Sequence, residues 1–178
     1  MIYFGMRKTA VIYGSKYGAT KQYATWIAEE LGADLMNYKD VKPKQIQSYD
    51  IVVFGGGIYA SGIMGIKSIK KSKPKQLTVF TVGLADPTTT DYSKILDKNF
   101  TKEERVEIKV FHLRGGIDYQ KLGVLYKMMM AMVKKSAEKR PAEKRTSEDQ
   151  ALLDTYGQKA SFINRSTIEP LIDYVCSL

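Results

Sequence analysis

The most chemically suggestive part of the sequence is a short polar segment that lies between an apolar run and a helix-like stretch. It reads Ser15, Lys16, Tyr17, Gly18, Ala19 and Thr20. Hydroxyl side chains stand at both ends, and Gly18 would let the backbone approach a ligand or adopt a positive φ. Where the helix begins, free N–H groups and the positive end of its dipole face one small volume, which suits a phosphate. The GxxxxGK[ST] and GxGxxG patterns are absent, and a simple N-capped turn is the alternative.

Two further segments follow apolar runs and carry unusual residues. Gly55–Gly62 is rich in glycine, which lets a backbone approach a flat ligand, and its Tyr59 offers a ring for stacking. A flexible turn with a surface tyrosine is the alternative interpretation. Gly83–Thr90 supplies backbone groups, Asp86 and three successive threonines, and is weakly specific by itself.

Short apolar runs alternate with helical patterns and predict the elements that position these loops. We expect strands at 9–13, 33–38, 51–54, 77–82 and 106–113, with residues 160–163 returning as the second part of the last strand. We expect helices at 24–31 (ending at Gly32), at 119–135, from an N-cap at Ser147, and at 166–176. Strands that alternate with helices indicate βαβ units around a doubly wound parallel sheet with helices on both faces. Ligands bind such sheets outside the carboxyl ends of the strands.

The composition excludes several classes of site. Cys176 is the single cysteine and His112 the single histidine, so an intramolecular disulfide and a multi-histidine metal site are both excluded. His112 lies in an apolar run and is interpreted as a strand histidine rather than a catalytic one. We therefore expect no metal site, and no side chain is named as a catalytic acid or base. No apolar run is long enough to span a membrane, and no secretory signal is evident.

The net charge of +9 is unevenly distributed along the chain. Residues 121–145 contain two acidic residues and eight basic ones, Lys121, Lys127, Lys134, Lys135, Lys139, Arg140, Lys144 and Arg145. The same segment has apolar residues at helical spacing, Leu122, Leu125, Tyr126, Met129, Met130 and Val133, with Met128 and Met132 widening the stripe. One interpretation is a helix that covers the sheet edge with its lysines in solvent. The other is a helix that docks on a membrane surface or a hydrophobic ligand.

Together the three loops resemble the FMN-binding loops of the flavodoxin family. Ser15, Gly18 and Thr20 match the phosphate loop of that family, whereas Tyr17 stands where many flavodoxins have threonine. The resemblance covers residues 6–178 as a single flavodoxin-like domain with a five-stranded sheet; residues 1–5 are interpreted as an upstream start or a tag remnant. It implies FMN as the cofactor. The residues that it assigns to FMN are Ser15, Lys16, Tyr17, Gly18, Ala19, Thr20, Gly57, Ile58, Tyr59, Ala60, Gly83, Leu84, Ala85 and Asp86.

A narrower resemblance comes from residues 115–160. Gly115-Gly116-Ile117-Asp118-Tyr119, followed by an apolar, lysine-bearing helix, is similar to the insertion in the last strand of menaquinone-dependent protoporphyrinogen IX dehydrogenases. This resemblance implies that an FMN-dependent oxidoreductase of haem synthesis oxidises protoporphyrinogen IX and passes electrons to menaquinone. The expected partners are therefore a quinone or tetrapyrrole substrate and a membrane surface contacted by 119–145.

Three alternatives bear on this function. An electron-carrying flavodoxin that serves protein partners is the first, although typical carriers are acidic. A non-redox module that binds a phosphate ligand on the same fold is the second. Nucleic-acid binding is the third, but no recognisable module is present and methionines rather than stacking aromatics interleave the basic run. A cytoplasmic location, at the inner face of the cell membrane, agrees with the single cysteine.

Overall fold

The fold is described by a computed structural model that covers residues 7–178. The interpretation of residues 1–5, and of Met6 as a start, therefore lies outside the described residues. The main sheet has five parallel strands in the order β2-β1-β3-β5-β6, with a short β4 antiparallel to β3. The strands are β1 (Thr9–Gly14), β2 (Asp34–Asn37), β3 (Ile51–Tyr59), β4 (Gly62–Ile63), β5 (Leu77–Gly83) and β6 (Lys109–Arg114). The predicted doubly wound parallel sheet is confirmed.

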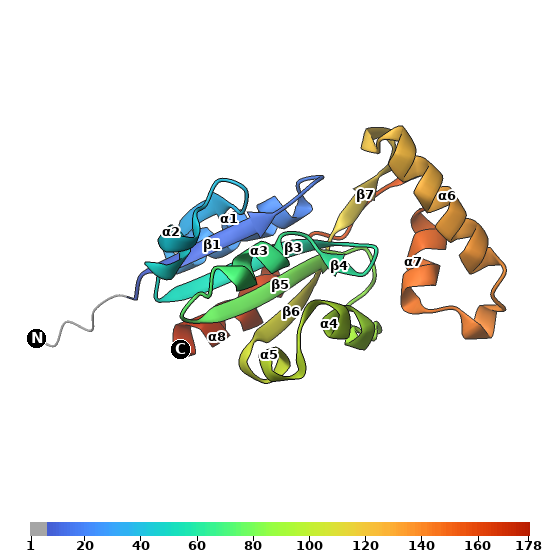
Figure 1. The fold of residues 1–178 in the computed structure, drawn as a ribbon. Helices are drawn as coiled ribbons and strands as arrows, with labels where there is room; N and C mark the ends of the chain where they lie inside the picture. Colours follow the sequence, from blue (N-terminus) through green and yellow to red (C-terminus); the bar gives the residue numbers. More distant parts are fainter. Residues whose placement is uncertain (1–6) are drawn as a thin grey trace, which may run out of the picture.

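Helices cover both faces of this sheet (Figure 1). They are α1 (Ala19–Leu31), α2 (Pro43–Gln47), α3 (Ile66–Lys71), α4 (Ser93–Asn99), α5 (Lys102–Glu107) and α8 (Glu169–Ser177), the last preceded by a 3-10 turn, η3 (Arg165–Ile168). On one face, α1 and α8 pack on Val11, Val53 and Phe80. On the other, α2, α3 and α4 pack on Ile12, Phe54 and Val79. The two cores take alternate residues of the strands, because successive side chains point to opposite faces of a sheet.

Two predicted boundaries near the sheet are wrong. Residues 106–108 do not begin a strand, because Thr101 forms a capping box with Glu104 and starts α5 there. The glycines of the Gly55–Gly57 run are not in a loop: they lie within β3, where Gly55 and Gly56 pair with both β1 and β5 and Gly57 pairs with β5. A Cβ at Gly55 would overlap the ring of Phe80. The run therefore leaves room for close packing in the centre of the sheet.

The segment after β6 leaves the sheet. It contains β7 (Gly116–Asp118), η1 (Tyr119–Lys121), α6 (Val124–Glu138), η2 (Ala142–Lys144), α7 (Ser147–Thr155) and β8 (Lys159–Ser161). The expectation that residues 160–163 rejoin the parallel sheet is wrong, since β8 pairs antiparallel with β7 in a separate two-stranded ribbon. The N-cap of α7 is Thr146 rather than Ser147, because Thr146 and Asp149 form a capping box. Figure 1 shows this ribbon carrying α6 and α7 beyond the carboxyl ends of the strands.

His112 lies in β6, as expected, and is half-buried against neighbouring side chains. Its ring stacks on Tyr92 with centroids 3.6 Å apart, and its Nδ1 lies 2.6 Å from the Thr81 hydroxyl. Burial lowers the pKa of His112 from 6.5 to about 4. The imidazole is therefore neutral in the folded protein at neutral pH.

Acidification is expected to remove the stability that depends on this neutral ring. Between the unfolded pKa of 6.5 and the folded value of about 4, the unfolded chain binds a proton that the folded chain does not. The contribution of the neutral His112 ring to the free energy of unfolding is thus complete above pH 6.5 and is lost as the pH falls towards 4. Urea unfolding across this window should show a steeper loss of unfolding free energy for the wild type than for His112→Phe. Parallel curves for the two proteins would contradict this assignment.

Candidate functional site

The loop after β1 forms an open helix N-terminus. Gly18 is the N-cap of α1 with φ 98° and ψ −21°, and no side chain caps the helix. The Gly18 N–H donates to the Ser15 hydroxyl oxygen at 3.0 Å. The first intrahelical hydrogen bond runs from the Gln22 N–H to the Gly18 carbonyl. The backbone amides of residues 19–21 therefore have no acceptor within the helix. The start of α1 therefore presents backbone amides without a partner inside the helix, and the phosphate site predicted there depends on this feature.

The charges around this loop also favour an anion. The first turn of α1 contains no acidic residue, and Lys16 lies in the loop itself. Thr20 is only 2% exposed at the base of the turn. The positive end of the helix dipole therefore meets no negative side chain in this first turn.

The loop after β3 is shorter than the sequence suggested and is a tight hairpin. Tyr59 pairs with Gly62, so that Ala60 and Ser61 form a two-residue turn with φ values of 48° and 63°. Positive φ at both positions is the type I′ pattern, which usually requires Asn or Gly. The Asn99 side chain donates to the Ser61 carbonyl at 2.8 Å, and Lys98 donates to the Ala60 carbonyl at 2.6 Å. Helix α4 thus holds the strained turn in place.

Ser61→Gly is expected to stabilise the protein by about 0.5–1 kcal/mol, because glycine adopts a positive φ without the steric cost that a Cβ carries. Ser61→Ala retains the Cβ and should give no such gain. Chemical denaturation of both variants measures the difference. A Ser61→Gly variant that is less stable than Ser61→Ala would show that the turn is not strained.

The loop after β5 is organised by β6. Arg114, at the end of β6, donates from Nε to the Leu84 carbonyl at 3.0 Å, and its guanidinium stacks on the Phe162 ring at 3.6 Å. Asp86 accepts hydrogen bonds from the Thr88 amide and hydroxyl, and these bonds lower the pKa of its carboxyl group. Asp86 therefore orders its own turn, and the backbone of this loop is what remains available to a ligand.

The insertion brings a residue to this edge that sequence reasoning did not assign to the site. The ring of Tyr126, on α6, lies 5.8 Å from that of Tyr17 and 6.2 Å from that of Tyr59, and Tyr17 lies 6.5 Å from Tyr59. The Lys16 ammonium lies 4.6 Å from the centroid of Tyr126. Two of the three predicted loops and the insertion therefore meet in one aromatic cluster. Only the helical stripe in the sequence pointed to Tyr126, and that pattern does not identify its neighbours.

Other kinds of site find no support in the part of the chain that the structure describes. Residues 7–178 contain no group of three His, Cys, Asp or Glu side chains placed to hold a metal ion. Within the same range, none of the helices combines the length and the apolar character needed to cross a bilayer.

A doubly wound sheet in this strand order, with an open helix N-terminus after its first strand, defines a flavodoxin-like α/β protein. The model of the flavodoxin domain family matches residues 10–144, and the chain belongs to that family. An uncharacterized protein of Methanocaldococcus jannaschii is 31% identical over 97 residues, which cover 51% of this chain and 65% of that protein. This chain thus matches just under two thirds of that relative's length.

Solved structures of flavodoxins are among those to which this chain is similar. A flavodoxin from the domain Archaea is 14% identical, with a TM-score of 0.42 over 61% of this chain and 85% of that one. Oxidised Flavodoxin 1 from Bacillus cereus is also 14% identical, with a TM-score of 0.44 over 60% of this chain and 84% of that one.

Proposed function

We propose that this protein is an FMN-dependent oxidoreductase. The observation that carries the proposal is the open N-terminus of α1, with its left-handed Gly18, its unpaired first-turn amides and its lack of acidic residues. This donor set fits a phosphate dianion, and the aromatic rings of Tyr17 and Tyr59 at the same edge fit a flat ring system. Family membership agrees with the same cofactor.

Each loop has a role in this proposal. Residues 15–20 would hold the FMN phosphate through backbone amides and hydroxyls, whereas 57–60 and 83–86 would contact the ring. When bound, FMN supplies the electron-transfer chemistry, and the protein orients it and sets its electrostatic surroundings. Arg114 would keep the third loop in its binding conformation through the bond to the Leu84 carbonyl. None of these roles requires a side chain that acts as an acid or base.

For the reaction, we propose oxidation of protoporphyrinogen IX, with electrons passed to menaquinone. Two features of the insertion support this choice. It places Tyr126 beside the proposed cofactor loops, and it carries the eight basic residues of 121–145, which suit a substrate with carboxylate groups. The insertion and the net charge of +9 argue against the alternative, a carrier of the acidic flavodoxin type.

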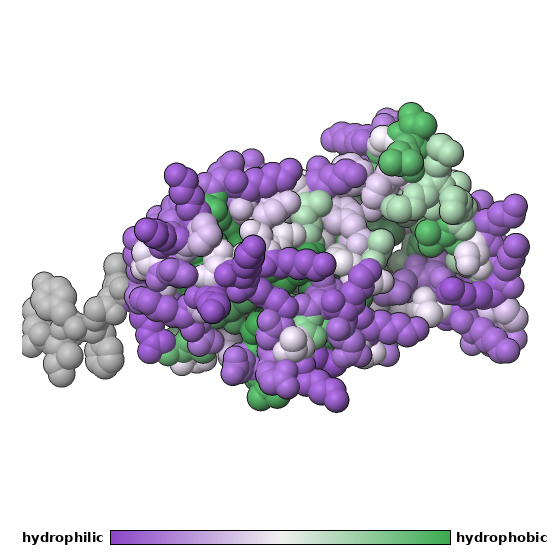
Figure 2. Space-filling model, in the orientation of Figure 1, coloured by the Kyte–Doolittle hydropathy of each residue, from purple (hydrophilic) through white to green (hydrophobic). Residues whose placement is uncertain are grey.

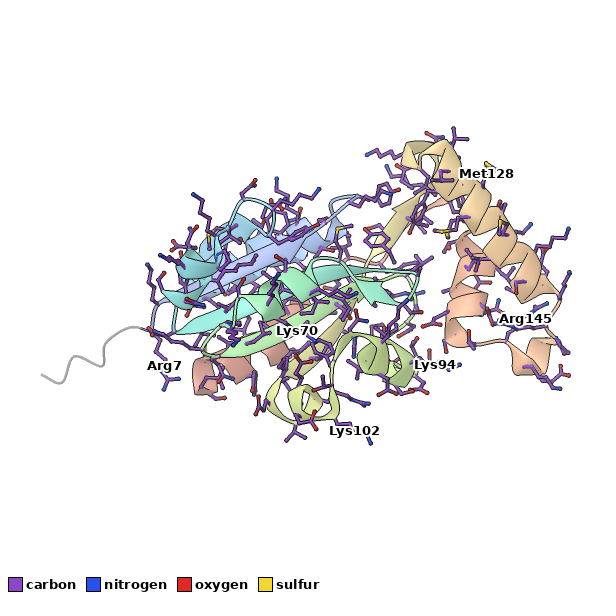
Figure 3. The ribbon with its side chains drawn as sticks, in the orientation of Figure 1. Arg7, Lys70, Lys94, Lys102, Met128 and Arg145 are labelled. Carbon is purple, nitrogen blue, oxygen red and sulfur yellow. The ribbon has the colours of Figure 1, made fainter. Side chains whose placement is uncertain are left out.

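We further propose that α6 contacts the cytoplasmic surface of the membrane, where menaquinone resides. Tyr126 and Ala137 face the rest of the protein, whereas Leu125, Met128 and Met132 are 82%, 62% and 72% exposed. Figure 2 shows hydrophobic residues gathered over α6, and Figure 3 shows Met128 pointing away from the sheet. The lysines at 127, 135 and 139 are also exposed. Apolar side chains beside exposed cations are typical of a helix that lies in an anionic interface.

This arrangement differs from the expectation of a helix that covers the sheet edge. In the structure α6 packs on α7, and the two stand beyond the ends of the strands (Figure 1). The outer apolar side chains of α6 are therefore left in solvent, which supports docking on an external surface.

Reconstitution with FMN followed by an assay tests this function. We expect the purified protein to bind FMN, with the absorbance of a bound flavin, and then to oxidise protoporphyrinogen IX in the presence of a menaquinone analogue. A protein that does not bind FMN would refute both the enzyme and the electron carrier. Bound FMN without porphyrinogen oxidation would refute the substrate and favour the carrier.

A further inference from the structure

A second concentration of basic residues lies on the sheet domain, within residues 39–75. This range holds eight lysines and only two acidic residues, Asp40 and Asp50, so its excess of positive charge equals that of 121–145. Of the 28 basic and 19 acidic residues of the chain, these two segments hold 16 and 4, which leaves 12 and 15 for the rest. The basic character of the protein therefore comes from two separate segments, and the proposed substrate and membrane contacts use only one of them.

The second segment forms one continuous face because α2 and α3 pack side by side. The Gln47 side chain, at the end of α2, donates to the carbonyl of Ser72, the C-cap of α3, at 3.0 Å. Ile46 of α2 and Ile66 and Ile69 of α3 are buried in the core beneath. Since the apolar side of each helix points to the sheet, the lysines of these helices are turned towards solvent.

Most of these cations have no carboxylate partner. Lys70 pairs with Glu104 at 2.6 Å and Lys75 with Asp50 at 3.0 Å. No ion pair among residues 7–178 involves the other six lysines of the segment. These six, all exposed, form what we call the lysine face: Lys39, Lys42, Lys44, Lys67, Lys71 and Lys73. Like charges held together on a rigid surface repel one another, so a partner with the opposite charge would be attracted to it.

The composition of the lysine face favours a protein over other polyanions. Residues 39–75 contain no arginine, the side chain that binds phosphate groups in a bidentate manner. The structure describes this whole range, and no large apolar or aromatic side chain in it is exposed. The face therefore offers nothing to insert into a bilayer or to stack on bases. Exposed lysines act instead as point charges that steer an oppositely charged protein into a small, short-lived interface.

The lysine face extends to the edge of the sheet where the proposed cofactor loops lie. Lys39 follows the end of β2, and its N–H donates to the Asn37 side-chain oxygen at 3.0 Å. The start of α3 lies beside the end of β1, since a Cβ at Gly14 would be 2.7 Å from the Met64 carbonyl oxygen. Helix α6 stands beyond the strand ends (Figure 1), and hydrophobic residues gather over it rather than over the sheet domain (Figure 2). The two surfaces are therefore distinct.

We propose that the lysine face is the docking surface for a second protein that carries a cluster of carboxylates, in a weak complex held mainly by charge. The partner would sit beside the cofactor loops and leave the outer side of α6 free. This inference goes beyond the proposed function, because neither FMN, the substrate nor the membrane contact requires the lysine face.

Calorimetric titration of the full chain without FMN tests the surface, with a plant-type [2Fe–2S] ferredoxin as an acidic protein probe. We expect binding in 0.1 M NaCl that is lost in 1 M NaCl, where the screening length falls from about 10 Å to about 3 Å. Loss of four exposed charge interactions should weaken binding about 10-fold. The variant that removes them, without touching an ion pair or a helix cap, combines Lys39→Gln, Lys44→Gln, Lys67→Gln and Lys71→Gln.

A matched control removes the same number of charges from the insertion. It combines four exposed positions, Lys121→Gln, Lys127→Gln, Lys135→Gln and Lys139→Gln. This variant should bind the ferredoxin within about 2-fold of the wild type, because screening limits the reach of its charges. On phosphatidylglycerol vesicles the order should be reversed, with the larger loss in the insertion variant.

Several results would overturn the proposal. One is a ferredoxin that does not bind, and another is equal weakening by the two variants, which would mean that binding follows net charge alone. Loss of affinity for a 20-base-pair DNA duplex or for the vesicles, as large in the lysine-face variant as the loss for ferredoxin, would assign the face to nucleic acid or membrane instead. If the circular dichroism of this variant is altered, Lys67→Gln with Lys71→Gln decides, with about 3-fold weaker binding expected. Failure to bind FMN would refute only the proposed function, since the titration uses the chain without it.

Discussion

Gly18→Val is expected to weaken FMN binding by about 100-fold, or close to 3 kcal/mol. Gly18 adopts φ 98° at the point where the chain enters α1. A β-branched residue is strongly disfavoured at such a φ, so the turn must change its backbone conformation. The amides that now point into one volume would then diverge, and the phosphate would lose several hydrogen bonds at once. Titration of the purified variant with FMN, followed by flavin fluorescence, measures the loss.

A matched control exists at the other end of the same helix. Gly32 also has a positive φ, 57°, and nothing lies within 4 Å of a Cβ built there. Gly32→Val should therefore destabilise α1 to a similar degree while its FMN affinity stays at the wild-type level. Thr20→Val removes a hydroxyl without backbone strain and should weaken FMN binding by a smaller factor, about 10-fold. If Gly18→Val binds FMN as the wild type does, the phosphate does not lie at this turn.

A triple substitution on α6, Leu125→Glu with Met128→Glu and Met132→Glu, is expected to lower binding to phosphatidylglycerol vesicles by more than about 100-fold. Each of these side chains is largely exposed, so its burial in the interface would contribute up to about 1.5–3 kcal/mol. The introduced carboxylates would in addition be repelled by anionic lipid. Vesicle co-sedimentation measures the change, and FMN affinity should be unaltered because none of the three residues belongs to the proposed cofactor loops.

The control for this experiment lies outside the insertion. Val106, on α5, is 87% exposed and stands alone, so Val106→Glu should leave vesicle binding unchanged. Replacement of Lys127, Lys135 and Lys139 by Gln should reduce binding to anionic vesicles and have little effect with phosphatidylcholine, since each lysine contributes about 1 kcal/mol near an anionic surface. Binding of the triple Glu variant at the wild-type level would eliminate α6 as the membrane contact.

Much of the sheet and one part of the site were predictable because they depend on neighbours along the chain. The apolar runs of β1, β3 and β5 identify buried parallel strands, and the stripe in 24–31 ending at Gly32 identifies α1. Ser15, Gly18 and Thr20 are adjacent to the start of that helix, so local pattern was sufficient to locate the open helix N-terminus there. Strand order then brought the other two loops to the same edge, as expected for this fold.

The remaining features depend on contacts between distant segments. The Gly55–Gly57 run reads as a loop, yet it is part of a strand, and the side chains of Phe80 and Ile63 occupy the space where a Cβ at Gly55 and at Gly56 would lie. Residues 160–163 read as sheet, yet β8 pairs with β7 because the chain turns away after Arg114. Similarly, the stripe on α6 does not distinguish an inward from an outward face. Which face of α6 points inward depends on its packing against α7 and on the cluster of Tyr126 with Tyr17 and Tyr59.

The sequence by itself determined the class of fold, the helix N-terminus that suits a phosphate, and the excess of charge in 121–145, because each depends on residue type and short-range spacing. Tertiary structure alone decided which side of α6 meets solvent, that Tyr126 and Lys16 border one cavity, and that the hairpin at Ala60–Ser61 is held by α4. The physical reason is that these contacts join segments far apart in the chain, and their geometry follows from how the layers pack rather than from any local pattern.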